Sequence, residues 1–200
     1  MSVGVSAWNR ELATAHFTQA CCDVLNAEAI LGLEEELPGA KAIALAQSQQ
    51  ACEKALKAWL LLAVGSDRYL RPGHQVWTVD LQAEALNRPP SRRIWAHEVR
   101  EGELRNIRER VRKALGNEVI EDLSELEGYA PLRSWDHPNS EYPWVDEHGI
   151  VQVPASYFDP VMIAGLKKKA LLLLDRVAEQ CNALKREWLK TKAVFRRQSQ

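Results

Sequence analysis

The sequence predicts an all-α protein, an up-and-down helical bundle of four to five helices with a long ordered loop before the C-terminal helix. Three observations favour this fold class. Apolar residues recur at steps of three and four over long stretches of the chain. Residues 40–64 consist largely of strong helix formers. Strand character is limited to a short hairpin expected around residues 149–153.

The first helix is expected to begin after Ser6 and to run to about Leu37. Ser6 stands at the N-cap position, where a hydroxyl accepts a hydrogen bond from a backbone N–H of the first turn. Behind it, apolar side chains recur at helical spacing, as expected for a helix with one buried face. These side chains are Trp8, Leu12, Ala15, Cys22, Leu25 and Ala29. Pro38 and Gly39 end the helix.

Residues 40–64 carry the strongest helix prediction in the chain. They are rich in Ala, Leu, Lys and Gln, and Gly65 follows at the position of a C-cap. The apolar stripe consists of Ala51, Ala55, Ala58, Trp59 and Leu62. Because a short Pro-Gly turn joins this helix to the first one, the two are expected to pack as an antiparallel hairpin.

The middle of the chain is less regular. Residues 66–82 show no clear pattern, and a charged helix is expected from about Glu98 to Leu115. Gly116 and Asn117 interrupt this helix, after which a helical pattern continues to Gly128.

Residues 129–157 are expected to form the long ordered loop. They contain four prolines together with Trp135, Tyr142 and Trp144, which is too aromatic for simple disorder. A loop of this length in a compact domain is usually functional or part of an interface.

The last helix is expected to open at Asp159 and Pro160, an N-cap followed by proline at the first helical position. Its apolar residues keep steps of four and three, which predicts one long packed helix. They are Ala170, Leu174, Val177, Cys181, Leu184 and Trp188.

Composition indicates one ordinary globular domain over residues 1–200. The chain is 46% hydrophobic and 26% charged with a formal net charge of −1, so the whole molecule does not attract polyanions. The charges are unevenly distributed, because residues 159–200 carry ten Lys or Arg against four Asp or Glu. Residues 86–117 hold nine basic and four acidic side chains, whereas residues 118–148 hold nine acidic ones against Arg133 alone. Such blocks are either partner-facing surfaces or, more commonly, solvated helix faces.

The four cysteines show neither zinc-ligand spacing nor a disulfide framework, and we expect reduced thiols. The N-terminus lacks the apolar core of a signal peptide, and the longest apolar run, residues 58–64, is far shorter than a membrane span. A cytoplasmic protein without a membrane partner is expected. Phosphate-binding glycine loops, HExxH and GxSxG are absent from the sequence, which excludes the common nucleotide-hydrolase, dehydrogenase, zinc-peptidase and hydrolase signatures.

The order of the remaining features resembles the HEPN family, the higher eukaryotes and prokaryotes nucleotide-binding domain. Residues 50–65 match a Gln-Ala-x-Glu-Lys-x-Leu-Lys-Ala-type helix of that family. His74 matches a histidine in the segment after this helix, and Tyr142-Pro143 matches the end of an Arg-Tyr-Pro element in which Glu141 replaces the arginine. The resemblance covers residues 6–82 and 118–190 and leaves residues 83–117 as an insertion.

This resemblance implies a helical bundle that dimerises and binds a nucleotide or RNA, often beside a nucleotidyltransferase partner that can act as the antitoxin. Many members are metal-independent endoribonucleases of toxin–antitoxin or defence systems, with an arginine and a histidine near the start of the last helix. An imidazole can move a proton at the ribose hydroxyl while a guanidinium binds the phosphate. Here residues 159–169 contain neither residue type, and the nearest pair by position is Arg133 and His137.

The candidate catalytic residues are therefore His74, Arg133 and His137, and the candidate ligand-binding residues are Lys54, Lys57, Arg68 and Tyr142. Neither a cofactor nor a metal is expected. Each residue also has a structural interpretation: a turn cap, a loop hydrogen bond, a solvated helix face or an aromatic side chain that anchors its loop. Three functions follow, namely a nucleotide- or RNA-binding protein, an endoribonuclease toxin that needs no metal, and a non-catalytic interaction module.

Overall fold

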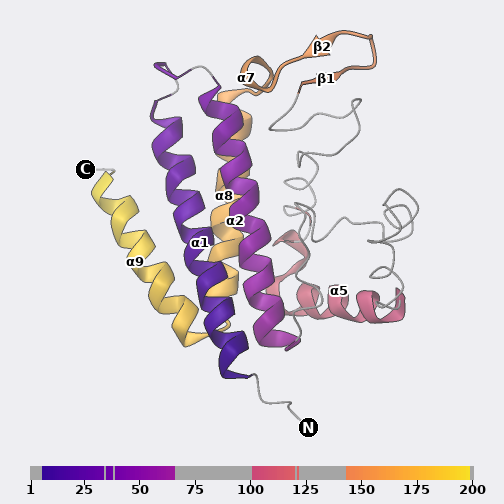
Figure 1. Cartoon of the computed structure of the whole chain (residues 1–200), viewed down its shortest axis with the longest axis vertical. Helices are drawn as coiled ribbons and strands as arrows, with labels where there is room; N and C mark the ends of the chain where they lie inside the picture. Colours follow the sequence, from indigo (N-terminus) through magenta and orange to yellow (C-terminus); the bar gives the residue numbers. More distant parts are fainter. Residues whose placement is uncertain are drawn as a thin grey trace.

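The computed structural model of the chain describes residues 6–33, 35–37, 39–65, 101–119, 121 and 143–198. The elements, in chain order, are α1 (Ala7–Leu31), α2 (Ala40–Ala63), α5 (Glu101–Leu115), β1 (Trp144–Val145), β2 (Val151–Gln152), α7 (Pro154–Tyr157), α8 (Pro160–Ala178) and α9 (Asn182–Gln198). Helices α1, α2, α8 and α9 lie side by side as a bundle (Figure 1). This arrangement confirms the predicted all-α class.

Helix α1 begins where the sequence predicts and ends six residues earlier than expected. The Ser6 hydroxyl accepts a hydrogen bond from the backbone N–H of Asn9 at 3.1 Å, which caps the first turn. The helix stops at Leu31, and turns connect it to α2, so the predicted end near Leu37 is wrong. Gly39 takes a φ of 85° directly before α2, a backbone conformation that favours glycine.

Small side chains allow α1 and α2 to pack closely. The buried stripe of α1 alternates alanines with larger residues at steps of four and three, and every member has 0% exposure: Ala13, Phe17, Ala20, Val24 and Ala27. The buried face predicted from the sequence is therefore wrong, because none of its six residues is buried and Trp8 is 57% exposed. Helix α2 is surrounded by protein on most sides, because 17 of its 24 residues are buried. The predicted antiparallel hairpin of these two helices is confirmed. The side chain of Asn9 also donates to the carbonyl of Gly65 at 3.0 Å, which joins the start of α1 to the end of α2.

The C-terminal segment forms two helices, so the prediction of one long helix is wrong. Asp159 caps α8 as expected, and its Oδ1 accepts from the N–H of Val161 at 2.7 Å. The helix ends at Ala178, and α9 then packs back against α8 and α1. The predicted apolar series nevertheless remains inside, because Val177, Leu184 and Trp188 are buried on both sides of the turn. Its spacing continues across the turn, and for this reason the sequence does not show the break.

The remaining described elements lie on the bundle's periphery. Helix α5 packs against α8, and Gly116 follows it with a φ of 96°, which confirms the predicted interruption. Strands β1 and β2 pair antiparallel, with Val145 opposite Val151, in the hairpin expected around Gly149. In the part of the chain that the structure describes, no helix has the length and apolar character needed to cross a membrane. All four cysteines lie in that part and are free thiols.

Candidate functional site

The structure describes two of the seven candidate site residues. Lys54 and Lys57 lie on α2, in its interface with α1. Arg68, His74, Arg133, His137 and Tyr142 lie outside the described residues, and their roles stay predictions. The predicted insertion, residues 83–117, is described only from Glu101 onward, as α5.

Lys54 belongs to an ion pair between α1 and α2. Its Nζ donates to Oδ2 of Asp23, whose side chain is only 4% exposed. Gln19 donates to the other oxygen of Asp23 at 2.9 Å, and Lys54 also reaches the side-chain oxygen of Gln50 at 3.3 Å. A buried carboxylate is stabilised only when such partners replace water. Lys54 therefore has a structural partner, and an anion that reached it would compete with Asp23.

Lys57 is paired within its own helix. Its Nζ donates to Oε1 of Glu53, one turn earlier, and both side chains are 10% exposed. A glutamate four residues before a lysine is the favourable orientation for such a pair on a helix. The ligand-binding role predicted for both lysines stays a prediction.

His16 on α1 lies near the two lysines of α2. Burial, and then the charge of Lys57, lower the pKa of His16 from its ordinary value of 6.5, with a smaller contribution from Lys54. The charge of Glu53 acts in the opposite direction. The imidazole is therefore neutral at pH 7, the form that accepts a proton in acid–base chemistry.

Arg10 and His16 are an arginine and a histidine close together in the sequence, as in the catalytic pair that the resemblance implies, and both lie on α1. Their six-residue separation places them about 120° apart around the helix, so they do not share a face. Within the described ranges, no group of three or more His, Cys, Asp or Glu side chains is arranged to hold a metal ion.

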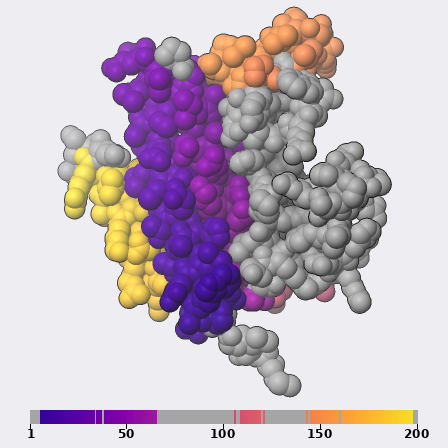
Figure 2. All heavy atoms as spheres, in the orientation of Figure 1, coloured from indigo at the N-terminus to yellow at the C-terminus, as the bar shows by residue number. Residues whose placement is uncertain are grey.

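Helix α9 presents a basic outer surface. One side of it is buried by Leu184, Trp188 and Thr191 against the bundle. The opposite side exposes five basic side chains, Lys185, Arg186, Lys190, Arg196 and Arg197. The single acidic residue of the helix, Glu187, is half-buried and binds Lys190 at 2.8 Å. Figure 2 shows α9 in yellow along one side of the molecule. We call these five residues the α9 basic face.

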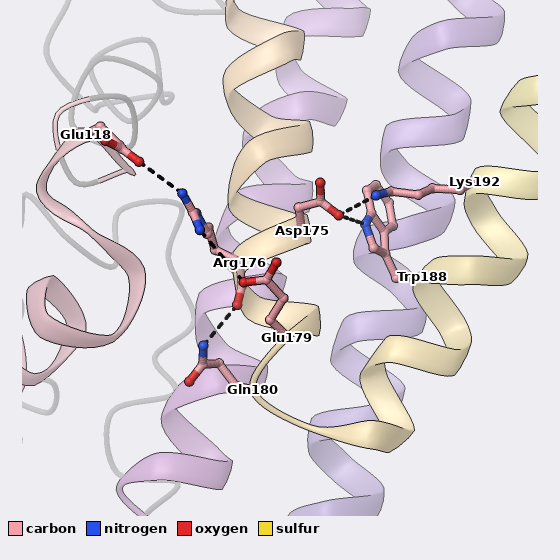
Figure 3. A network of polar contacts seen from close by, with 7 residues as sticks. All are labelled: Glu118, Asp175, Arg176, Glu179, Gln180, Trp188 and Lys192. Atoms are coloured by element: carbon pink, nitrogen blue, oxygen red, sulfur yellow. Dashed lines mark hydrogen bonds and ion pairs between the residues drawn. The ribbon is translucent and has the colours of Figure 1, made fainter.

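A polar joint fixes the orientation of the α9 basic face. Asp175 of α8 accepts hydrogen bonds from the indole N–H of Trp188 and the ammonium group of Lys192, both on α9 (Figure 3). The Lys192 ammonium also lies 5.3 Å from the centre of the Trp188 ring. Burial alone would raise the pKa of Asp175, but the bonds from Lys192 and Trp188 outweigh it and lower that pKa. Because the joint uses the inner side of α9, the outer basic side chains keep their exposure.

The sequence did not identify the individual residues of the α9 basic face or of the polar contacts between α1 and α2. Residues 159–200 carry ten basic residues against four acidic ones, which indicated a basic C-terminal element. Because one continuous helix was predicted there, the outward-facing basic side chains could not be identified. Asp23 and His16 lie seven residues apart, which places both on the side of α1 that faces α2, and this spacing is the signal that could have found them.

Comparison of the chain with protein-family models, with curated proteins and with solved structures found no match.

Proposed function

We propose that this chain is a HEPN-like helical protein that binds RNA through the α9 basic face. The observation that supports this most is the exposure of five basic side chains on one helix whose only carboxylate, Glu187, pairs with just one of them, Lys190. Phosphate contacts from Lys and Arg supply most of the sequence-independent affinity for nucleic acid. An all-α bundle is the fold that the family resemblance implies, and most of the matching residues 50–65 lie in α2.

RNA fits this surface better than a single nucleotide does. Helix α9 has 17 residues and is therefore about 25 Å long. Its basic side chains run from Lys185 near the start to Arg197 near the end, so they can contact successive phosphates of a chain. A mononucleotide would use only one or two of them. As an alternative, we propose that the chain binds a nucleotide at the candidate residues Lys54, Lys57, Arg68 and Tyr142.

Three neutralising substitutions test the α9 basic face. The variant K185Q/R186Q/R197Q removes three exposed charges, and the control R112Q/K113Q/K168Q removes three exposed charges from α5 and α8. Binding of a labelled single-stranded RNA is measured by fluorescence anisotropy over a range of salt concentrations. Each phosphate contact contributes about −0.7 to the salt slope for single strands, so the α9 variant is expected to reduce the slope by about 2. An equal loss in the control, or a wild type that does not bind RNA, contradicts the proposal.

The same RNA, incubated in EDTA and analysed for cleavage, separates binding from endoribonuclease activity. Cleavage by the wild type that is lost in a variant with His74 and His137 replaced by alanine would make the chain a metal-independent ribonuclease. Intact RNA after incubation supports binding without catalysis.

The homodimer and the nucleotidyltransferase-type partner that the resemblance implies belong to the same proposal. Light scattering of the purified protein tests whether the chain is a homodimer.

A further inference from the structure

Exposed apolar side chains gather at one end of the bundle. Nine of the twelve large hydrophobic side chains that the described residues expose lie at this end, on the α1–α2 connection, the β1–β2 hairpin, α7 and the first turns of α2 and α8. The nine are Leu33, Leu37, Ile43, Val145, Ile150, Val151, Val153, Tyr157 and Val161. We call this set the apolar end. A gathering of this kind on a protein surface usually marks an interaction site.

The parts that form the apolar end lie together in space. Helix α7 packs against α2, and a Cβ placed on Gly39 would lie 3.3 Å from the Cβ of Ala155. Figure 1 shows the α1–α2 connection, α7 and the β1–β2 hairpin at the same end of the bundle. Figure 2 shows that the hairpin, in orange, projects beyond the helices at this end of the bundle.

The hairpin tip is held rigidly by Asp146. One of its carboxylate oxygens accepts from the backbone N–H groups of His148 and Ile150, each at 2.9 Å, and the other accepts from the side chain of Gln152 at 2.7 Å. Gly149 supplies the positive φ that the turn requires. These bonds hold Ile150 and Val151 outward, at 57% and 64% exposure. A preorganised apolar surface loses little conformational entropy when a partner binds.

Charge decides which partner suits the apolar end. Residues 35–43 and 143–161 carry five carboxylates, Glu35, Glu36, Asp146, Glu147 and Asp159, against the single lysine Lys41. Glu147 is 88% exposed at the hairpin tip. This excess repels RNA and anionic lipid headgroups. It also disfavours a symmetric pairing of two copies through this end, because such an interface brings the same charges together.

We propose that the apolar end is a docking surface for a cationic amphipathic segment of a partner protein. Apolar residues of the segment cover the aliphatic side chains of the hairpin and of the first turn of α8, and its basic residues pair with the surrounding glutamates. This surface shares no residue with the α9 basic face, so the proposal does not depend on RNA binding.

The test uses a fluorescein-labelled Leu/Lys peptide with helical amphipathic spacing, and a Leu/Glu peptide with the same spacing. The Leu/Lys peptide is expected to bind the full chain, to bind less well as salt increases, and to lose about tenfold in affinity in I150S/V151S/V161S. The matched control W8S/L189S/V194S removes three exposed apolar side chains elsewhere and is expected to bind like the wild type. Circular dichroism melting of each variant shows that the fold is retained.

Several outcomes would overturn the proposal. The charge argument fails if the Leu/Glu peptide binds equally well, or if E35Q/E36Q/E147Q leaves the salt dependence of Leu/Lys binding unchanged. An equal loss in the matched control shows unspecific attachment. Sedimentation that shows self-association of the wild type and a monomeric I150S/V151S/V161S variant assigns the apolar end to a second copy of the chain.

Discussion

His16 is a half-buried histidine, and its surroundings disfavour the protonated, charged form. Burial and the nearby Lys57 lower its pKa in the folded chain, whereas the unfolded chain returns it to about 6.5. Between these two values the unfolded chain binds more protons than the folded one. The free energy of unfolding therefore decreases as the pH falls below about 6.5, and the loss is complete below the folded-state pKa.

Substitution of His16 by glutamine is expected to remove this part of the pH dependence. Urea unfolding of the wild type and of His16→Gln is compared from about pH 7.5 to about pH 5.5, a window above the titration of the carboxylates. The wild type is expected to lose stability across this window and the variant to lose less. Equal slopes in the two proteins would show that other groups cause the dependence and that His16 is not the proton acceptor.

Single residues also show the limits of prediction from the sequence. The Ser6 and Asp159 caps are confirmed because capping depends on neighbours within one turn, which the sequence contains. The partner of Lys54 is 31 residues away, and only the packing of α1 on α2 determines it. The sequence therefore identified Lys54 as a charged residue of α2, but not as one member of an interhelical ion pair.

At the scale of elements, two glycines of the bundle have opposite roles. Gly39 has a φ of 85° at the start of α2, and a Cβ there would lie 3.3 Å from that of Ala155. Gly165 is exposed inside α8, and a Cβ there would contact nothing within 4 Å. Glycine is thus needed at the first position and lowers helix stability at the second.

The alanine substitutions are expected to change stability in opposite directions. Gly39→Ala should lower the free energy of unfolding by about 1–2 kcal/mol, because alanine is strained at positive φ. Gly165→Ala should raise it by about 0.5–1 kcal/mol, because it removes a flexible residue from a helix interior. Urea unfolding curves of both variants and of the wild type measure these changes. A shift of the same sign in both variants would contradict this account of the two sites.

The break between α8 and α9 shows what local patterns leave undetermined. Glu179 and Gln180 form the turn, and neither is a residue that interrupts helices. Backbone bonds from Gln180 to Val177 and from Cys181 to Ala178 close it. The Asp175 joint to Trp188 and Lys192, together with the packing of α9 on α1, then stabilises the reversal. These contacts are tertiary, so helical periodicity alone predicted a continuous helix.

At the scale of the whole molecule, the two proposed surfaces have opposite chemistry. The α9 basic face carries five cations, and the apolar end carries nine large hydrophobic side chains with an excess of carboxylates. The sequence contains this polarity as a basic C-terminal segment on an acidic body. Only the reversal at Glu179 makes the basic residues of α9 an outer surface of the bundle, because it returns the helix along α1 and α8.

The two surfaces are expected to act independently. They share no residue and no hydrogen bond among those described, and changes at well-separated sites usually have additive effects. K185Q/R186Q/R197Q should weaken RNA binding and leave Leu/Lys peptide binding unchanged, whereas I150S/V151S/V161S should do the reverse. The variant that combines all six substitutions should lose RNA binding and peptide binding, each to the same extent as the separate variant does.

Peptide titrations with and without saturating RNA measure the coupling directly. Because coupling between two binding sites is reciprocal, a shift in peptide affinity caused by RNA would require an equal shift in RNA affinity caused by the peptide. Such a pair of shifts would contradict independence and show that the two surfaces are coupled.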